Sequence, residues 1–176
     1  MKTSFRKKQL MIALLVLVAL LSGCRFLINP PSSAEVREFL RRNQNDIDVI
    51  VSYLKTLETD SAYINNDEGV FYEFEIHNNI PEEVKDSIRK ISNQGCSTIG
   101  KNKSNTVFFE IWYTNFGDAD CGFACTIDGQ GTPKTEFQIY CEELGNGWFY
   151  FYDDYEEYRS HPSKYKDNQP FANATP

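Results

Sequence analysis

Four short runs of aromatic and β-branched residues decide the fold: TVFFEIWY at residues 106–113, CGFACTI at 121–127, TEFQIYCE at 135–142 and WFYFY at 148–152. Such runs are typical of β-strands, and the segments between them are rich in the turn-forming residues Asn, Asp, Gly and Pro. Short strands in close succession along the chain predict an antiparallel meander.

Two further candidate strands precede these runs: VFYEFEI at residues 70–76 and the segment 96–100. Apolar residues at helical spacing predict one amphipathic helix over residues 33–58, begun by a capping box of Ser32 and Glu35, with a kink allowed near Asn45. A short helix follows Pro81 and ends before Gly95. The sequence therefore predicts an α+β fold of two layers. A long N-terminal helix and a short helix pack on a mainly antiparallel meander of five or six strands.

The first 23 residues have the pattern of an export leader. Four basic residues and no acidic residue precede twelve apolar residues at positions 10–21. A twelve-residue helix spans about 18 Å, short of the roughly 30 Å core of a bilayer, so the segment predicts a removable signal peptide rather than a membrane span. It ends in Leu21-Ser22-Gly23-Cys24.

At this point the chain resembles bacterial lipoproteins, whose leaders end in small residues followed by a cysteine. The resemblance implies that the Cys24 thiol receives a diacylglyceryl group and that signal peptidase cuts between Gly23 and Cys24. Two acyl chains anchor a protein durably, so the implied location is the extracytoplasmic face of the cell membrane. The exported region also resembles small uncharacterised lipoproteins of low-GC Gram-positive bacteria, a likeness that implies no activity and supplies no site residues.

The expected domain organisation follows from this processing. Residues 24–32 are the lipidated cysteine and a short tether, and residues 33–159 form a single domain. The segment 160–176 is polar and contains prolines, which predicts a disordered tail.

Composition and charge exclude several classes of protein. The 176-residue chain has 41% hydrophobic and 24% charged residues, which is typical of a globular domain and not of a collagen-like, disordered or multi-span membrane protein. Without the four basic residues of the leader, 14 of the 18 Lys and Arg remain against 25 Asp and Glu, a net charge of −11. Such an acidic surface repels phosphate backbones, so we expect no nucleic-acid partner.

Four cysteines remain besides Cys24: Cys96, Cys121, Cys125 and Cys141. An even number in an exported chain predicts two disulfides. Within one strand, the Cα atoms of Cys121 and Cys125 would lie about 13 Å apart, beyond the roughly 7 Å limit for a bridge. If residues 127 and 135 pair across a turn, Cys121 lies opposite Cys141, which favours a Cys121–Cys141 bridge with Cys96–Cys125 as the second. A four-cysteine zinc site is disfavoured by the C-x₃-C spacing, and buried free thiols remain an alternative.

The sequence contains no catalytic motif that points to an enzyme class. The patterns G-x-S-x-G, H-E-x-x-H, the P-loop and G-x-G-x-x-G are absent, and neither His77 nor His161 has a spacing that pairs it with a nucleophile. Acidic pairs that offer carboxylates for a glycosidase or a weak calcium site are Asp118/Asp120, Glu142/Glu143 and Asp153/Asp154. Solvated loops explain them more simply. We expect no catalytic residue, metal or cofactor, and the pattern favours a protein that is not an enzyme.

An aromatic run at residues 148–158, WFYFYDDYEEY, is the most unusual stretch. Alternation in a strand places Trp148, Tyr150 and Tyr152 on one face and Phe149 and Phe151 on the other. If the Phe face enters the core, the Trp148/Tyr150/Tyr152 row forms an exposed face for a glycan, a cationic peptide or a protein partner. The alternative is that both faces are covered, one by a helix and the other by the tail or by aromatic neighbours such as Trp112, because aromatic runs usually pack.

Three functions compete on these observations. The leading prediction is a membrane-anchored lipoprotein with a small non-enzymatic binding domain for a protein, peptide or glycan ligand. The second is an acidic immunity or inhibitor protein that neutralises a basic toxin or enzyme through charge complementarity, and the third is a cell-wall or glycan hydrolase. An exposed aromatic row would favour binding, a flat acidic face would favour the inhibitor, and a concave pocket holding two carboxylates would favour the enzyme.

Overall fold

A computed structural model describes residues 29–59, 61–65, 72–73, 80–114 and 118–165. The chain divides into two compact units, Met1–Pro31 and Ser32–Pro176, and the second contains every helix and strand described below. The leader and Cys24 lie outside the described residues, so the signal peptide and the lipid anchor remain predictions.

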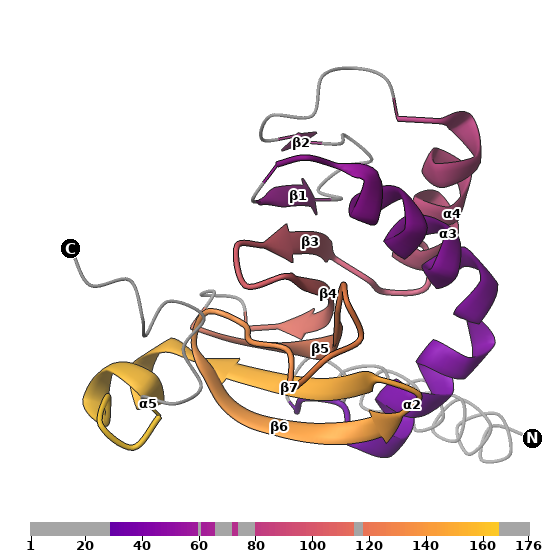
Figure 1. Cartoon of the computed structure of the whole chain (residues 1–176). Coiled ribbons are helices and arrows are strands. Elements are labelled where there is room, and N and C mark those ends of the chain that lie inside the picture. Colours follow the sequence, from indigo (N-terminus) through magenta and orange to yellow (C-terminus); the bar gives the residue numbers. More distant parts are fainter. Residues whose placement is uncertain (1–28, 60, 66–71, 74–79, 115–117, 166–176) are drawn as a thin grey trace, which may run out of the picture. The chain divides into compact units, whose positions relative to one another are not determined.

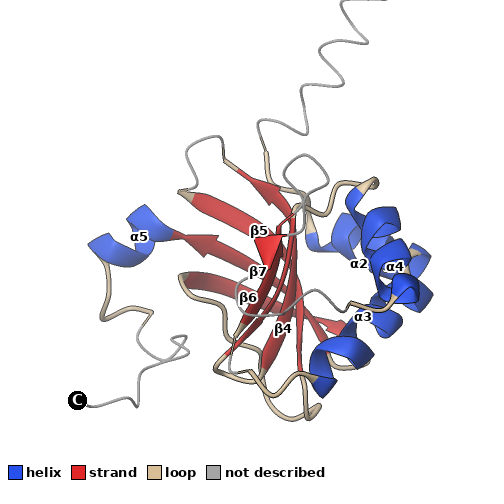
Figure 2. Cartoon of the chain, turned by 90° about the horizontal axis from the view of Figure 1, so that it is seen from above, coloured by secondary structure: helices blue, strands red, loops and turns tan. Residues whose placement is uncertain are grey.

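Helices α2 (Ser33–Arg42), α3 (Gln44–Thr56) and α4 (Glu82–Ser92) lie along one face of the sheet (Figure 2). The predicted capping box is confirmed, because the Ser32 hydroxyl accepts from the Glu35 amide and the Glu35 carboxylate accepts from the Ser32 amide at 2.8 Å. The single long helix that the periodicity predicts is broken at Asn43, whose side-chain amide donates to the Phe39 carbonyl at 3.0 Å. The bend therefore lies two residues before the expected position.

Within the described residues, seven strands form one sheet in the order β2-β1-β3-β4-β5-β7-β6, and every neighbouring pair is antiparallel (Figure 1). The strands are β1 (Ala62–Asn65), β2 (Tyr72–Glu73), β3 (Thr98–Asn102), β4 (Thr106–Tyr113), β5 (Ala119–Thr126), β6 (Gln138–Gly145) and β7 (Trp148–Asp154). The α+β class and the antiparallel sheet are confirmed. Strand β1 was not predicted, because its four residues AYIN lack a long β-branched run.

The last two strands do not follow the predicted meander, in which strands that are consecutive in the sequence are neighbours in the sheet. Strand β7 pairs with β5, and β6 lies beyond it at the edge of the sheet. Since β5 and β6 are each antiparallel to β7, they run parallel to one another, and parallel strands require a crossing connection rather than a tight turn. Residues 127–137 make that crossing, which from here on we call the crossing loop.

The main core lies between the helices and one face of the sheet. Side chains of the helices, including Val36, Ile47 and Ile88, pack against Phe109 and Phe123 of the two central strands. The Phe109 and Phe123 rings stack at 4.7 Å between centroids. This arrangement buries one face of the sheet beneath α2, α3 and α4 and leaves the opposite face without cover from these three helices (Figure 2).

Strand β7 continues into a short helix, α5 (Tyr155–Ser160), which sequence analysis did not predict. The Asp154 side chain caps it by accepting from the Glu157 amide at 2.8 Å. Beyond α5 the Tyr165 ring is buried and stacks on Tyr158, and the Tyr165 hydroxyl donates to the Glu157 carboxylate at 2.8 Å. The expectation of a disordered tail from residue 160 is therefore wrong as far as residue 165, and residues 166–176 lie outside the described part.

Candidate functional site

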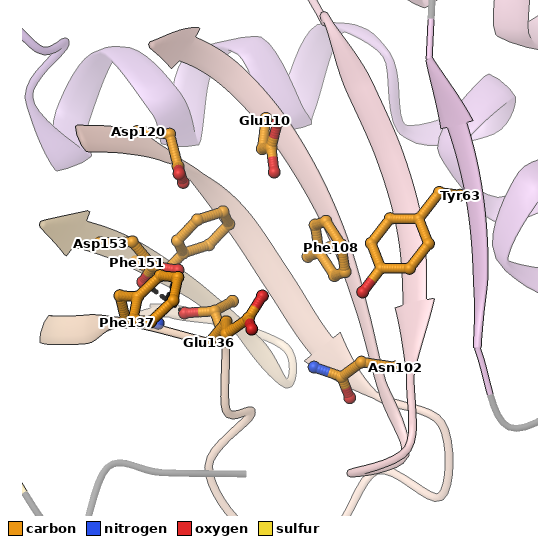
Figure 3. Close-up of a pocket in the computed structure, with 10 residues that line it drawn as sticks. Tyr63, Asn102, Phe108, Glu110, Asp120, Glu136, Phe137, Phe151 and Asp153 are labelled. Carbon is orange, nitrogen blue, oxygen red and sulfur yellow. Dashed lines mark hydrogen bonds between the residues drawn. The ribbon is translucent and has the colours of Figure 1, made fainter. Parts of the chain in front are cut away.

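The face of the sheet opposite α2, α3 and α4 carries a cavity of about 220 Å³ (Figure 3). A water molecule needs about 10–15 Å³ measured in this way, so the cavity has room for a small ligand. We call it the carboxyl cavity, because four carboxyl groups line it. Its lining residues are Tyr63, Asn102, Phe108, Glu110, Asp120, Thr135, Glu136, Phe137, Phe151 and Asp153.

The cavity is hollow because small residues stand in the middle of this face. Gly122 lies between Glu110 and Phe151 in the register of the sheet, and Ala124 is the neighbour of Phe108. A Cβ atom on Gly122 would lie 1.8 Å from the Phe109 carbonyl oxygen, so no larger residue fits there without a shift of the backbone. The large rings therefore stand around the small residues and leave the centre of the face open.

The crossing loop supplies one wall of the cavity through Thr135, Glu136 and Phe137. Among the hydrogen bonds that hold the loop on the sheet, two join it to β3 and β4: the Asn102 side chain donates to the Lys134 carbonyl at 2.7 Å, and the Lys134 amide donates to the Thr106 hydroxyl at 3.0 Å. The wall is thus fixed to strands β3 and β4 although the loop itself belongs to neither.

Asp120 and Asp153 form the polar centre of the cavity. They are directly opposite one another on β5 and β7, so their side chains extend from the same face with Cβ atoms about 5 Å apart. The Asp153 carboxylate accepts from the Thr135 hydroxyl at 2.5 Å and from the Phe137 amide at 3.5 Å. The Oδ1 atom of Asp120 is buried and has no hydrogen-bond partner within the described residues.

Burial of this pair disfavours ionisation of both groups together. Burial raises the pKa of Asp120, and the charges of Asp153, Glu110 and Glu136 raise it further. Burial also raises the pKa of Asp153, while the bonds from Thr135 and Phe137 favour its ionised form. Asp120 lacks such donors, so it is the member of the pair that holds a proton most tightly.

The remaining polar groups make the cavity strongly acidic. Burial raises the pKa of Glu110, against a hydrogen bond with Thr98. Burial and the charges of Glu136 and Glu110 raise the pKa of the Tyr63 hydroxyl. No Lys, Arg or His is among the described residues that line the cavity, so its charge has no compensating partner within the lining.

Aromatic rings form the apolar part of the lining. Phe108 meets Tyr63 edge to face at 5.7 Å and meets Phe151 edge to face at 6.4 Å between centroids. Gly100 allows this placement, because the Phe108 ring lies 2.2 Å from the position that a Cβ atom on Gly100 would occupy. Successive rings are therefore turned relative to one another and present both faces and edges around the cavity (Figure 3).

The predicted aromatic binding face lies on the other side of the sheet, in the main core. Trp148 and Tyr150 are each 7% exposed and belong to the cluster beneath the helices, and Tyr152 packs against that cluster and stacks on Trp112. Phe151, expected in the core, is buried, but in a second cluster with Phe108 on the cavity side of the sheet. The Trp148/Tyr150/Tyr152 row is therefore not an exposed binding face, and the alternative of covered faces holds for Trp148, Tyr150 and Phe151.

The predicted disulfides are not present in the structure, where Cys96, Cys121, Cys125 and Cys141 are free thiols. The pairing of Cys121 with Cys141 assumed that β5 and β6 are neighbours. Strand β7 lies between them, with Tyr152 opposite Cys121 and Phe151 opposite Cys141. Since Tyr152 and Phe151 point to opposite faces, so do the two thiols.

Two negative findings apply to the described part of the chain. It contains no helix long and apolar enough to cross a membrane. No group of three or more His, Cys, Asp or Glu side chains in it is arranged to hold a metal ion.

The sequence named two of the four carboxyl residues, Asp120 and Asp153, but placed each in a different pair. Asp118 is exposed, and His77 lies outside the described residues. Glu110, Glu136 and Tyr63 were not singled out. One sequence signal pointed to the site: the seven residues 128–134 between the predicted strands exceed the two to five of an ordinary hairpin loop.

Comparisons with known proteins identify no relative of this chain. No protein-family model matches the chain, no curated protein matches it, and no solved structure matches its fold.

Proposed function

We propose that the chain is a membrane-anchored exported lipoprotein whose α+β domain binds a small ligand in the carboxyl cavity. The Leu-Ser-Gly-Cys sequence at residues 21–24 supports the anchor. The observation that carries the binding function is the cavity itself, which combines a buried carboxyl pair with a wall of aromatic rings.

The unpartnered oxygen of Asp120 is the strongest argument for a ligand. A buried polar atom without a hydrogen bond is destabilising, and native proteins keep few of them. Asp153 already receives the donors of Thr135 and Phe137, whereas Asp120 receives none from the described residues. A ligand with a hydrogen-bond donor would satisfy that oxygen.

A binding screen on the full-length protein in detergent tests this proposal. The probes are small amines and soluble oligomers of N-acetylglucosamine, and the readout is the shift of backbone amide signals in nuclear magnetic resonance spectra. We expect a bound probe to shift the signals of Asp120, Thr135, Phe137 and Asp153 and to lose affinity in Asp120→Asn. The exposed neighbour Asp118→Asn is the matched control. A probe that binds equally well to Asp120→Asn and shifts other signals would contradict the proposal.

A hydrolase is the second candidate, and the Asp120–Asp153 pair favours it. In a glycoside hydrolase one protonated carboxyl donates to the leaving group while an ionised carboxylate acts as nucleophile or base. Asp120 has the character of the acid and Asp153 that of the ionised partner. Cleavage of aryl glycosides or cell-wall glycans by the full-length protein, lost in both Asp120→Asn and Asp153→Asn and kept in Asp118→Asn, would establish it. Absence of cleavage with intact ligand binding would leave the binding function alone.

The inhibitor alternative receives less support. It predicts a flat acidic face that docks on a basic protein. The four cavity carboxyls lie instead in a depression walled by rings and by the crossing loop, which a protein surface does not readily enter.

A further inference from the structure

We propose that the ligand of the carboxyl cavity is a small organic cation, an amine or quaternary ammonium group held between the aromatic rings and the Asp120–Asp153 pair. This inference rests on the proposed binding function and names the chemical class of the ligand. Three features of the cavity carry it: its uncompensated acidity, the arrangement of its rings, and the free acceptor on Asp120.

Acidity is the first feature. Carboxyl groups reach the cavity from four separate elements: Glu110 on β4, Asp120 on β5, Asp153 on β7 and Glu136 in the crossing loop. Tyr63 faces them from β1, and none of the described lining residues is basic. A neutral ligand would leave this charge as it is, whereas a cation would compensate it.

Aromatic rings are the second feature. The edge-to-face contacts of Phe108 with Tyr63 and with Phe151 turn neighbouring rings by 61° and 88°. Walls of mutually tilted rings can present several negative ring faces to one central group. This is the arrangement that recognises ammonium groups, because the face of an aromatic ring attracts a cation within about 6 Å of its centroid.

The free acceptor is the third feature. Asp120 Oδ1 is buried at the cavity and accepts no bond from the described residues. An ammonium N–H would donate to it, and a quaternary ammonium would compensate its charge without donating. Either cation replaces the proton that the pair otherwise retains, so binding releases protons and strengthens as the pH rises.

The test uses matched probes that differ only in charge. Choline and its uncharged carbon isostere 3,3-dimethylbutan-1-ol have nearly the same shape, and putrescine adds a primary amine. Titration calorimetry of the full-length protein in detergent, at pH 6 and pH 8 and in two buffers of different ionisation enthalpy, measures affinity and proton release together.

We expect choline or putrescine to bind at least about tenfold more tightly than the isostere. We also expect each cation to bind about tenfold more tightly at pH 8 than at pH 6, which is the change in affinity when binding is coupled to one pKa unit of differential interaction. Asp120→Asn should lower the affinity for the cation and abolish most of the pH dependence, and Asp118→Asn should change neither. Glu136→Gln, an exposed position on the crossing loop, gives a second variant that leaves the core untouched and should weaken binding several-fold.

Several outcomes would overturn the inference. Equal affinity for choline and for its isostere would show that shape alone is recognised. Binding of calcium at the same residues, with displacement of choline, would identify a metal site instead. If N-acetylglucosamine oligomers bind at these residues and the amines do not, the cation inference fails while the binding function stands. If no probe shifts a cavity signal in the folded protein, both fail.

Discussion

At the scale of single residues, the cavity depends on two carboxyl groups that burial keeps from ionising together. Asp153 is 6% exposed and is stabilised by donors from the crossing loop, whereas Asp120 has no donor of its own among the described residues. Their carboxyl groups are held close by the register of β5 and β7. Burial of such a pair lowers the stability of the native state, and it also preorganises an acidic site.

Burial of the Asp120 carboxyl group predicts that the free energy of unfolding depends on pH in an unusual direction. The native pKa of Asp120 lies above its value of about 3.9 in an unfolded chain, so at neutral pH the native state binds more protons than the unfolded state. The free energy of unfolding should therefore fall as the pH rises from about 5 to about 9. Asp120→Asn should flatten that slope and be more stable than the wild type at pH 8, as measured by urea denaturation at each pH. Asp118→Asn should keep the wild-type slope, and an unchanged slope in Asp120→Asn would contradict the burial of this charge.

Cysteine reactivity gives a second test at this scale. Burial raises the pKa of Cys121 and Cys125 to about 12 and that of Cys141 to about 11, and Cys141 is also the more exposed of the three. Since the thiolate is the reactive form, Cys141 should be the first to react with a disulfide reagent at pH 8. The folded Cys141→Ser variant should lack this fast phase. In the unfolded wild-type domain, Cys96, Cys121, Cys125 and Cys141 should all react. Release of thiols only after reduction would instead favour the disulfides predicted from the sequence.

At the scale of elements, β7 is the strand that organises the sheet. It pairs with β5 on one side and β6 on the other, and its two faces enter two different clusters of buried side chains. Trp148 and Tyr150 pack beneath the helices, and Phe151 closes the floor of the cavity. Phe149 is half-buried and belongs to neither cluster.

These differences predict the stability of variants along β7. Tyr150→Ala and Phe151→Ala should each lower the free energy of unfolding by roughly 3–5 kcal/mol, the usual loss for a large aromatic residue removed from a core. Phe149→Ala should cost markedly less, because its ring is partly solvated in the native state. Chemical-denaturation midpoints of the three variants measure the order. A loss in Phe149→Ala as large as in Tyr150→Ala would show that the Phe149 ring is as fully packed as Tyr150.

At the scale of the whole molecule, the proposed function gives the leader and the domain separate roles. The domain supplies the cavity, and the proposed lipid on Cys24 supplies the location. Residues 25–32 join the two over at most about 26 Å when fully extended, so an anchored domain works close to the membrane surface.

The anchor is tested by Cys24→Ser. Without the thiol that receives the lipid, we expect the protein to leave the membrane fraction or to accumulate as an uncleaved precursor, because the two acyl chains provide the durable attachment. Cell fractionation with mass analysis of the N-terminus measures both outcomes. Ser22→Ala, which keeps a small residue beside the cleavage position, is the control and should be processed normally. Normal processing and membrane retention of Cys24→Ser would exclude lipidation at this residue.

Local features of the sequence predicted most of the elements. The capping box at Ser32 and Glu35, the helix that follows Pro81 and the strand Thr106–Tyr113 depend on residues a few positions apart, so the sequence by itself determined them. The charge and composition likewise required no structure. Alternation along residues 148–152 correctly separated the Trp148 and Tyr150 face from the Phe149 and Phe151 face.

Tertiary structure decided what those elements form together. Alternation states which residues share a face, but the helices determine which face they cover, and they cover Trp148 and Tyr150. Strand order depends on contacts between residues far apart in the sequence, which a pattern of short period does not encode. The insertion of β7 between β5 and β6 separated Cys121 from Cys141 and brought Asp120 opposite Asp153. The carboxyl cavity therefore exists because of one long-range pairing, whereas the helices and strands around it follow from the local sequence.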